Sequence, residues 1–281
     1  MELTHLSYSS LSNYIRCGHA YQLTKRFGVE EQPAWWSIGG SAVHTATEEL
    51  DEKNLLDLEG DDIEAFWLDH LEAAIQDAIK KGWDLENLRA SKVRSDKDPF
   101  YPNEDKLWWQ YKGLDMLLNY RNWRRQSPWK LYEIDKQPAI ELGLVPSIST
   151  GMPVKMFIDR LFIDNDDNIV VVDIKTGKST PRTPLQLAFY AWGLSKFPDT
   201  PIKVTKGCYY NLRSDKMTET FDLTHKKNIV DVLLARFQQA VENDVYVPNT
   251  ENCDTCGVKY KCFFGSGTLD DPTISEGEKN G

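Results

Sequence analysis

The sequence contains no apolar run near the ~20 residues that a membrane-spanning helix needs, so we expect no membrane anchor. The start of the chain, Met1 to His5, also lacks the basic residues and the apolar stretch of a secretion signal. We therefore expect a cytoplasmic protein, bacterial or phage-encoded and acting in the host cytoplasm. Acidic residues outnumber basic ones, 43 to 33, and the net charge of −10 argues against nonspecific wrapping of nucleic acid.

The charges are unevenly distributed along the chain. Many acids lie between Glu48 and Glu64 and in residues 265–281, whereas basic residues gather at 121–130 and 175–182. Because exposed charges are screened beyond ~10 Å at moderate salt, a local groove can be positive on an acidic protein. The net charge therefore does not exclude a nucleic acid as partner.

Hydrophobic periodicity divides the chain into helical and strand-like segments. We predict helices over residues 9–26, 39–50, 61–81, 104–125, 184–196 and 224–244, and strands over residues 131–144, 154–159, 169–175 and 203–212. This order favours an α/β (α+β) fold in which helices flank a mixed sheet. We expect one domain, residues 1–264, with a helical insertion at about 51–128, and then a disordered acidic tail, residues 265–281.

Two acids and a lysine stand out at the ends of apolar runs. Asp159 and Asp173 lie at the ends of two consecutive apolar runs, and Lys175 lies two residues after Asp173. Residues 164–168, between the runs, are of turn-forming types, so the segment predicts a β-hairpin. Because side chains alternate along a strand, Asp173 and Lys175 share one face, and the hairpin can bring Asp159 beside them. Such a group suits a divalent cation and a phosphate, although acid-x-lysine pairs are also common as solvated salt bridges.

Further motifs around the hairpin carry a family resemblance. They are Thr176-Gly177-Lys178, Gln186 and Tyr190 four apart on the next predicted helix, and Gly39 to His44 at the start of an earlier one. With the acids and the lysine, the pattern resembles the RecB-like branch of the PD-(D/E)xK nucleases. That branch includes AddB-type nuclease domains and the CRISPR-associated RecB-like exonucleases. The resemblance implies a restriction-endonuclease-like mixed sheet flanked by helices.

The resemblance also implies roles for individual groups. It assigns four of them to a Mg²⁺ or Mn²⁺ site: His44, Asp159, Asp173 and the main-chain carbonyl of Ile174. An imidazole ligand favours Mn²⁺ over Mg²⁺. Lys175 would orient the attacking water or help to deprotonate it, and would stabilise developing negative charge. Gln186 and Tyr190 would contact the substrate strand or support the site.

Cysteine is scarce, with five in 281 residues, but three are clustered. Cys253, Cys256 and Cys262 lie close together, Cys17 lies far upstream, and Cys208 is expected to be a buried thiol. In an intracellular protein such a cluster favours a metal, and spacing alone leaves Zn²⁺ and an iron–sulfur cluster open. The RecB-like resemblance, with one cysteine before the nuclease motifs and three after them, implies a [4Fe–4S] cluster on Cys17, Cys253, Cys256 and Cys262.

The function that the resemblance implies is a metal-dependent DNA exonuclease that hydrolyses phosphodiester bonds from the ends of single-stranded or unwound DNA. Such enzymes act in recombination, repair, phage DNA metabolism or CRISPR adaptation, so helicase, recombination and CRISPR adaptation proteins are candidate partners. Two alternatives stay open: a non-catalytic DNA-binding or assembly subunit with the same fold, and a nuclease that acts on RNA. The intact set of Asp159, Asp173 and Lys175 argues against the first.

Overall fold

The polypeptide folds into two units that alternate along the sequence. The computed structural model describes residues 3–94, 100–197 and 201–274. Unit 1 comprises Met1–Gln32, Leu144–Met156 and Asn228–Gly281, and unit 2 comprises Pro33–Gly143 and Phe157–Lys227. The predicted catalytic residues all lie in unit 2, and the four cysteines of the predicted cluster all lie in unit 1.

A mixed sheet forms the centre of unit 2, as the order of predicted elements indicated. β5 (Met156–Ile163) pairs antiparallel with β6 (Ile169–Lys175), and β6 pairs parallel with β7 (Lys206–Asn211). Shorter strands extend the sheet: β1 (Lys130–Leu131) and β4 (Ile140–Leu144) beside β5, and β8 (Lys216–Met217) and β9 (Phe221–Asp222) beside β7.

The predicted strand over residues 131–144 is broken into short pieces. Asp135 and Lys136 adopt positive φ angles of 51° and 66°, which turn the chain between β2 (Glu133–Ile134) and β3 (Gln137–Pro138). Both residue types can occupy such a turn, but periodicity over a short window does not reveal it.

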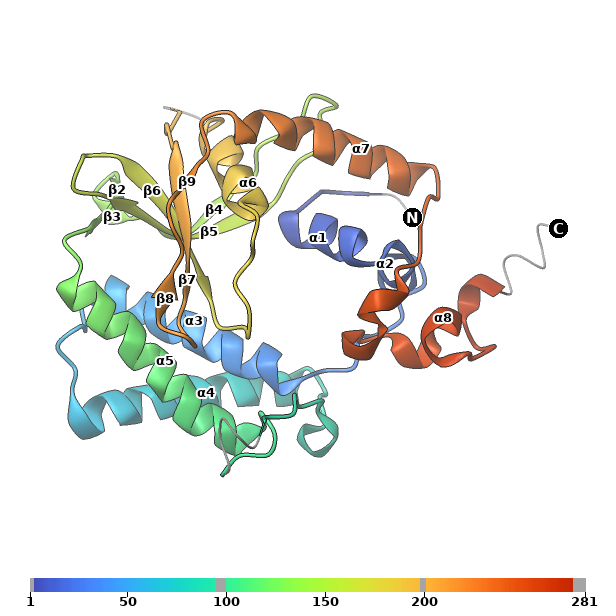
Figure 1. Cartoon of the computed structure of the whole chain (residues 1–281), viewed down its shortest axis with the longest axis horizontal. Coiled ribbons are helices and arrows are strands. Elements are labelled where there is room, and N and C mark those ends of the chain that lie inside the picture. The colour runs from blue at the N-terminus through green and yellow to red at the C-terminus, as the bar shows by residue number, and fades with distance from the viewer. Residues whose placement is uncertain (1–2, 95–99, 198–200, 275–281) are drawn as a thin grey trace. The chain divides into compact units, whose positions relative to one another are not determined.

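Helices cover both faces of the sheet in unit 2. Figure 1 shows α3 (Trp35–Glu52), α4 (Gly60–Lys80) and α5 (Lys106–Gln126) grouped on one side and α6 (Leu185–Leu194) on the other. Val170, Val172 and Ile174 of β6 point into the core formed with α3, α4 and α5. The alternate residues of β6, including Asp173, therefore face α6, and Tyr190 of α6 contacts Asp173.

Glycines allow α3, α4 and α5 to pack closely. A Cβ atom on Gly39 would lie 2.0 Å from the Trp109 ring of α5, and a Cβ on Gly113 would lie 2.0 Å from the Trp67 ring of α4. The sequence prediction that Gly39 begins a helix was wrong, because α3 begins at Trp35 and runs through both glycines. His44 therefore lies in the middle of α3 and not in its first turns.

A buried network of charged groups joins α3, α5 and β5. Asp51 of α3 accepts hydrogen bonds from Arg160 Nε of β5 at 2.9 Å, from Arg124 Nε of α5 at 2.8 Å, and from the hydroxyl of Tyr120. Arg160 is 1 % exposed, and it also donates to the carbonyl of Asp159. The network fixes the position of α3 on the strand that carries Asp159.

Unit 1 contains α1 (Tyr8–Arg16), α2 (Gly18–Lys25), α7 (Val230–Glu242) and α8 (Phe263–Ser266). The single helix predicted over residues 9–26 is interrupted at Cys17, whose extended backbone ends α1 and caps α2. The Cys17 sulfur accepts from the Ala20 amide at 3.5 Å, which is an N-cap contact. The rings of Tyr14 and Tyr21 pack against Phe237 of α7.

Short 3₁₀ segments complete the structure: η1 (Leu85–Asn87), η2 (Lys226–Ile229), η3 (Thr250–Thr255) and η4 (Lys259–Lys261). Within the predicted acidic tail, residues 265–281, Asp271 is fully buried, and residues 275–281 lie outside the described residues. Within the described ranges, none of the helices combines the length and hydropathy required to cross a membrane.

Replacing Asp51 with Ala should lower the free energy of unfolding by about 3–5 kcal/mol, because it leaves two buried guanidinium groups without their carboxylate. Denaturant titration measures this loss. Glu52→Ala, at the exposed neighbouring position on α3, is the control and should change stability little. Equal stability of the two variants would contradict the role of the network.

Candidate functional site

The predicted hairpin is present, and it brings the two acids together. Arg160 of β5 pairs with Val172 of β6 in the antiparallel ladder. Asp159 and Asp173 are the next residues on the two strands, so they lie opposite each other. Asp159 Oδ2 accepts a hydrogen bond from the amide of Ile174 at 2.7 Å. Asp173 is completely buried, whereas Asp159 is partly exposed.

Asp173, Lys175, Gln186 and Tyr190 form a closed ring of polar contacts. Lys175 Nζ lies 2.6 Å from Asp173 Oδ2 and donates to Gln186 Oε1 at 2.9 Å. Gln186 Nε2 donates to the hydroxyl of Tyr190 at 2.8 Å, and that hydroxyl donates to Asp173 Oδ1 at 3.4 Å. The spacing of four on α6 puts Gln186 and Tyr190 on one face, and that face supports the acid and the lysine.

The environment of Asp173 disfavours its charged form. Burial, and then the charge of Asp159, raise the pKa of Asp173 to about 7, although Lys175 opposes the shift. Burial also raises the pKa of Tyr190 well above its ordinary value. Tyr190 is thus a neutral hydrogen-bond donor, and Asp173 needs a cation to become fully ionised near neutral pH.

His44 lies beside two glutamates that the sequence analysis did not assign. Ligand atoms of His44, Glu48 and Glu141 all lie within 4.8 Å of one another, and His44 Nδ1 lies 4.0 Å from Asp159 Oδ2. Burial, together with Asp159 and Glu48, raises the pKa of Glu141 to about 8. The spacing of four residues between His44 and Glu48 could have indicated from the sequence that they share a helix face. No pattern in the sequence indicates that Glu141 of β4 lies beside them.

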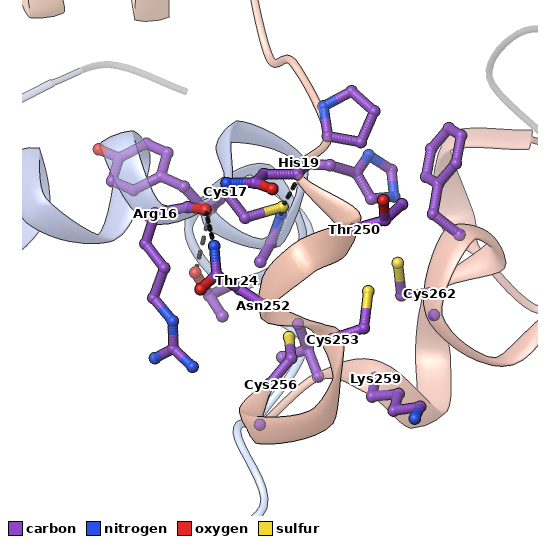
Figure 2. Close-up of a pocket in the computed structure, with 18 of the residues that line it drawn as sticks. Arg16, Cys17, His19, Thr24, Thr250, Asn252, Cys253, Cys256, Lys259 and Cys262 are labelled. Carbon is purple, nitrogen blue, oxygen red and sulfur yellow. Dashed lines mark hydrogen bonds between the residues drawn. The ribbon is translucent and has the colours of Figure 1, made fainter.

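The four cysteines of the predicted cluster line one cavity in unit 1. The cavity has a volume of ≈ 100 Å³. Figure 2 shows that Cys17 lines one side of this cavity and that Cys253, Cys256 and Cys262, from the C-terminal segment, line the rest. Burial raises the pKa of the Cys256 and Cys262 thiols. Cys208, in contrast, is fully buried within the core of unit 2, as expected for a packed thiol.

Backbone contacts bring Cys17 to the C-terminal cysteines. The amide of Gly18 donates to the carbonyl of Val247 at 2.9 Å, and a Cβ on Gly18 would lie 2.7 Å from the Val247 nitrogen. The Asn249 amide donates to the Cys17 sulfur at 3.3 Å, and Asn252 donates to the carbonyl of Arg16. The approach requires glycine at position 18.

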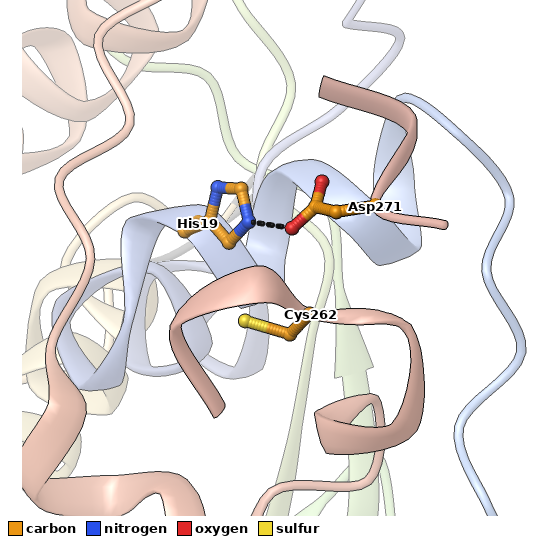
Figure 3. Close-up of side chains that lie close together, drawn as sticks. All are labelled: His19, Cys262 and Asp271. Carbon is orange, nitrogen blue, oxygen red and sulfur yellow. Dashed lines mark hydrogen bonds and ion pairs between the residues drawn. The ribbon is translucent and has the colours of Figure 1, made fainter. Parts of the chain in front are cut away.

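A buried histidine–aspartate pair lies next to Cys262. Figure 3 shows His19 of α2 and Asp271 joined by a hydrogen bond of 2.8 Å, with Cys262 beside them. Asp271 also accepts from the Phe263 amide and from Thr273, so its oxygens are well satisfied. The pair anchors the segment after Cys262 to α2.

The match to a family model covers the proposed catalytic residues and the four clustered cysteines. Residues 5–263 match the model of the PD-(D/E)XK nuclease superfamily. The chain belongs to the PD-(D/E)XK nuclease superfamily. Membership indicates a metal-dependent nuclease that hydrolyses DNA, with Mg²⁺ or Mn²⁺ as the usual ion.

Two curated phage proteins are similar to this PD-(D/E)XK chain over most of its length. The Gene 69 protein of Mycobacterium phage D29 is 24% identical over 266 residues, which cover 91% of this chain and 95% of that protein. The Gene 69 protein of Mycobacterium phage L5 is 25% identical over 301 residues, with the same coverage. Among solved structures, the crystal structure of SSO0001 aligns with 13% identity and a TM-score of 0.40, covering 93% of this chain and 87% of that one.

The raised pKa values of Asp173 and Glu141 predict how the stability of the metal-free nuclease depends on pH. Both carboxyls hold protons in the folded state up to about pH 7 and 8, whereas unfolded carboxyls lose them near pH ~4. The folded state therefore binds more protons in this window, and stability should fall as pH rises from 5 to 8. Thermal unfolding measured at several pH values in the presence of a chelator gives the change in stability with pH.

Asp173→Asn and Glu141→Gln should each flatten this slope, while Glu52→Gln, at an exposed position, should leave it unchanged. Mn²⁺ should restore stability most at pH 8, because metal binding requires deprotonated ligands. Stability that rises with pH in the metal-free protein would contradict the shifts.

Proposed function

We propose that this protein is a metal-dependent DNA exonuclease of the RecB-like type that also carries a [4Fe–4S] cluster. The observation that supports catalysis most strongly is the ring of Asp173, Lys175, Gln186 and Tyr190 beside Asp159. A scaffold protein has no need for two carboxylates and a lysine gathered at one point of the sheet, because the cost of burying their charges would serve no chemistry.

The residues present fit a divalent ion. Among the residues that the structure describes, none donates a hydrogen bond to the buried Oδ2 of Asp173, and the ammonium group of Lys175 lies 2.6 Å from it. The ion's ligands would be Asp159, Asp173, His44 and the carbonyl of Ile174. When bound, such an ion neutralises phosphate charge and lowers the pKa of a bound water.

The protein groups have separate tasks in the proposed hydrolysis. The Ile174 amide orients Asp159 through its hydrogen bond to Oδ2. Gln186 and Tyr190 hold Lys175 and Asp173 in place. The Lys175 side chain is 26 % exposed, so its ammonium group can reach a water or a phosphate oxygen. A cation fixed in this position stabilises negative charge that develops during attack on phosphorus.

A basic groove in unit 2 supports a polyanionic substrate despite the net charge of the chain. Its volume is about 500 Å³, and the basic residues that line it are Lys92, Arg94, Lys112, Lys178 and Arg213. Two acids also line it, and Glu104 is neutralised by Arg213 at 2.8 Å. Lys178 follows the catalytic lysine by three residues, so phosphates bound in the groove would lie near the proposed site.

Lys175→Ala should reduce cleavage of end-labelled single-stranded DNA in Mn²⁺ by about 10²–10³-fold, because it removes the fixed cation. Rates measured without oxygen on cluster-loaded protein test this. Lys216→Ala, at an exposed position on β8, is the matched control and should cleave at the wild-type rate.

Other outcomes of the same assay discriminate between the alternatives. Cleavage by Lys175→Ala at the wild-type rate would contradict the catalytic role of the lysine. Absence of cleavage by folded wild type would favour a DNA-binding or assembly subunit, and preferential cleavage of RNA would favour an RNA-directed nuclease. A ladder of products shortened from one end would support exonuclease action, for which the present support is the RecB-like resemblance.

The four cysteines line one cavity in unit 1. Their ligand type fits a zinc ion or an iron–sulfur cluster, since both accept four thiolates. The RecB-like resemblance, with one cysteine before the nuclease motifs and three after them, supports the [4Fe–4S] cluster.

Protein prepared without oxygen should contain about four iron atoms per chain and no zinc. Cys253→Ala should lose most of the iron, because one corner of the cluster loses its ligand. Cys208→Ala, which removes a thiol from the core of unit 2, is the control and should keep it. Stoichiometric zinc without iron in the wild type would assign Zn²⁺ to the site.

The proposal also includes a pathway and partner proteins for this nuclease. The RecB-like resemblance favours roles in recombination, repair, phage DNA metabolism or CRISPR adaptation, with helicase, recombination or CRISPR adaptation proteins as partners. The two mycobacteriophage relatives favour a role in phage DNA metabolism in the bacterial cytoplasm.

A further inference from the structure

We propose that Phe157 stacks on a nucleobase next to the scissile phosphate and thereby selects single-stranded over double-stranded DNA. The inference rests on the proposed nuclease function, and it names a residue that determines the choice of substrate. Phe157 lies on β5, two residues before Asp159. It is neither a ligand of the proposed ion nor a member of the ring around Asp173.

Phe157 and Asp159 lie on the same face of β5. Burial alternates at the start of this strand, where Met156 and Ile158 are buried, Phe157 is exposed and Asp159 is partly exposed. Side chains two residues apart on a strand are separated by roughly 7 Å. This separation is comparable with one nucleotide step of an extended strand. A phosphate bound at Asp159 would therefore bring a neighbouring base within reach of the Phe157 ring.

The ring of Phe157 is supported by β4 and is still accessible. A Cβ atom on Gly143 of β4 would lie 3.3 Å from Phe157 Cε1, so the ring lies close to the β4 backbone. Phe157 is nevertheless 62 % exposed. Single exposed apolar residues are common on protein surfaces, but this one lies on the strand that carries a proposed metal ligand. A ring that is supported before binding loses little conformational freedom when a base stacks on it.

Stacking is the kind of contact that this part of the site can offer a strand of DNA. The charge of Asp159 acts on the carboxyl groups of Asp173 and Glu141, so the surroundings are negative before an ion binds. An aromatic ring binds the face of a base without repelling the phosphates, and it accepts every base. Inside a duplex both faces of each base are covered, so the ring can stack only on an unpaired base. The contact therefore favours a single strand and not a particular sequence.

Binding of a fluorescent single-stranded oligonucleotide in Mn²⁺, measured by anisotropy, tests the proposal. The parent protein is Lys175→Ala, in which slow cleavage keeps the DNA intact. Adding Phe157→Ala should raise the Kd for the single strand about tenfold, because one stacked base is lost, and should leave the Kd for a duplex unchanged. Phe157→Trp should keep the affinity of the parent, because indole also stacks. Ile79→Ala, at a position 45 % exposed on α4, is the matched control and should bind like the parent.

The dependence of binding on salt separates stacking from a contact with phosphate. Phe157→Ala should raise the Kd by the same factor at every salt concentration, because the ring carries no charge. Lys178→Ala removes a cation from the basic groove. It should instead reduce the slope of log Kd against log salt by about 1.

Oligonucleotides that each carry one abasic site identify the base that stacks. In the parent protein, an abasic site at one position should raise the Kd about tenfold. In the protein that also carries Phe157→Ala, the same abasic site should have no further effect, because both changes remove the same contact. Effects that multiply at every position would contradict stacking on Phe157.

Two further results overturn the inference: a Kd for the single strand that Phe157→Ala leaves unchanged, or an equal loss of affinity for single strand and duplex. Failure of the proposed function looks different. Cleavage by the wild type together with unchanged binding by Phe157→Ala refutes the stacking alone. A tenfold loss of binding in Phe157→Ala, without any cleavage by the wild type, refutes the nuclease function alone. Circular dichroism verifies that each variant is folded.

Discussion

The buried ion pair between Asp51 and Arg160 is the constraint on which the site in unit 2 depends. Arg160 directly follows Asp159 on β5, and Asp51 lies two turns after His44 on α3. His44, Glu48 and Asp51 recur at helical spacing, so one face of α3 carries all three toward the strands. The pair thereby fixes the distance between the histidine on the helix and the acid on the sheet.

The same region concentrates negative charge that the metal-free protein only partly compensates. Asp173 is buried and Glu141 is half buried, and burial together with neighbouring carboxylates raises the pKa of each. Cation binding would remove this repulsion, so stability and function depend on the same ions. The ring through Lys175, Gln186 and Tyr190 explains why the site keeps its geometry under such repulsion: each member donates to or accepts from the next.

Local patterns in the sequence predicted the hairpin, the helix of Gln186 and Tyr190, and the mixed sheet, because alternation and helical spacing report directly on which side chains share a face. The start of α3 was misplaced because Gly39 serves close packing against Trp109 and not a helix end. Glu141 and Asp271 could not be predicted, since each acquires its partners from a distant segment of the chain. The hydrogen bond from the Asn249 amide to the Cys17 sulfur likewise joins segments that are far apart in the sequence.

The most direct test of the account is cleavage of DNA in which sulfur replaces a non-bridging oxygen of the scissile phosphate. If an ion at Asp159 and Asp173 contacts that phosphate, sulfur should slow cleavage in Mg²⁺, and Mn²⁺ should relieve the slowing because it accepts sulfur more readily. Equal slowing in both ions, or cleavage that persists in a chelator, would contradict metal-dependent hydrolysis at this site.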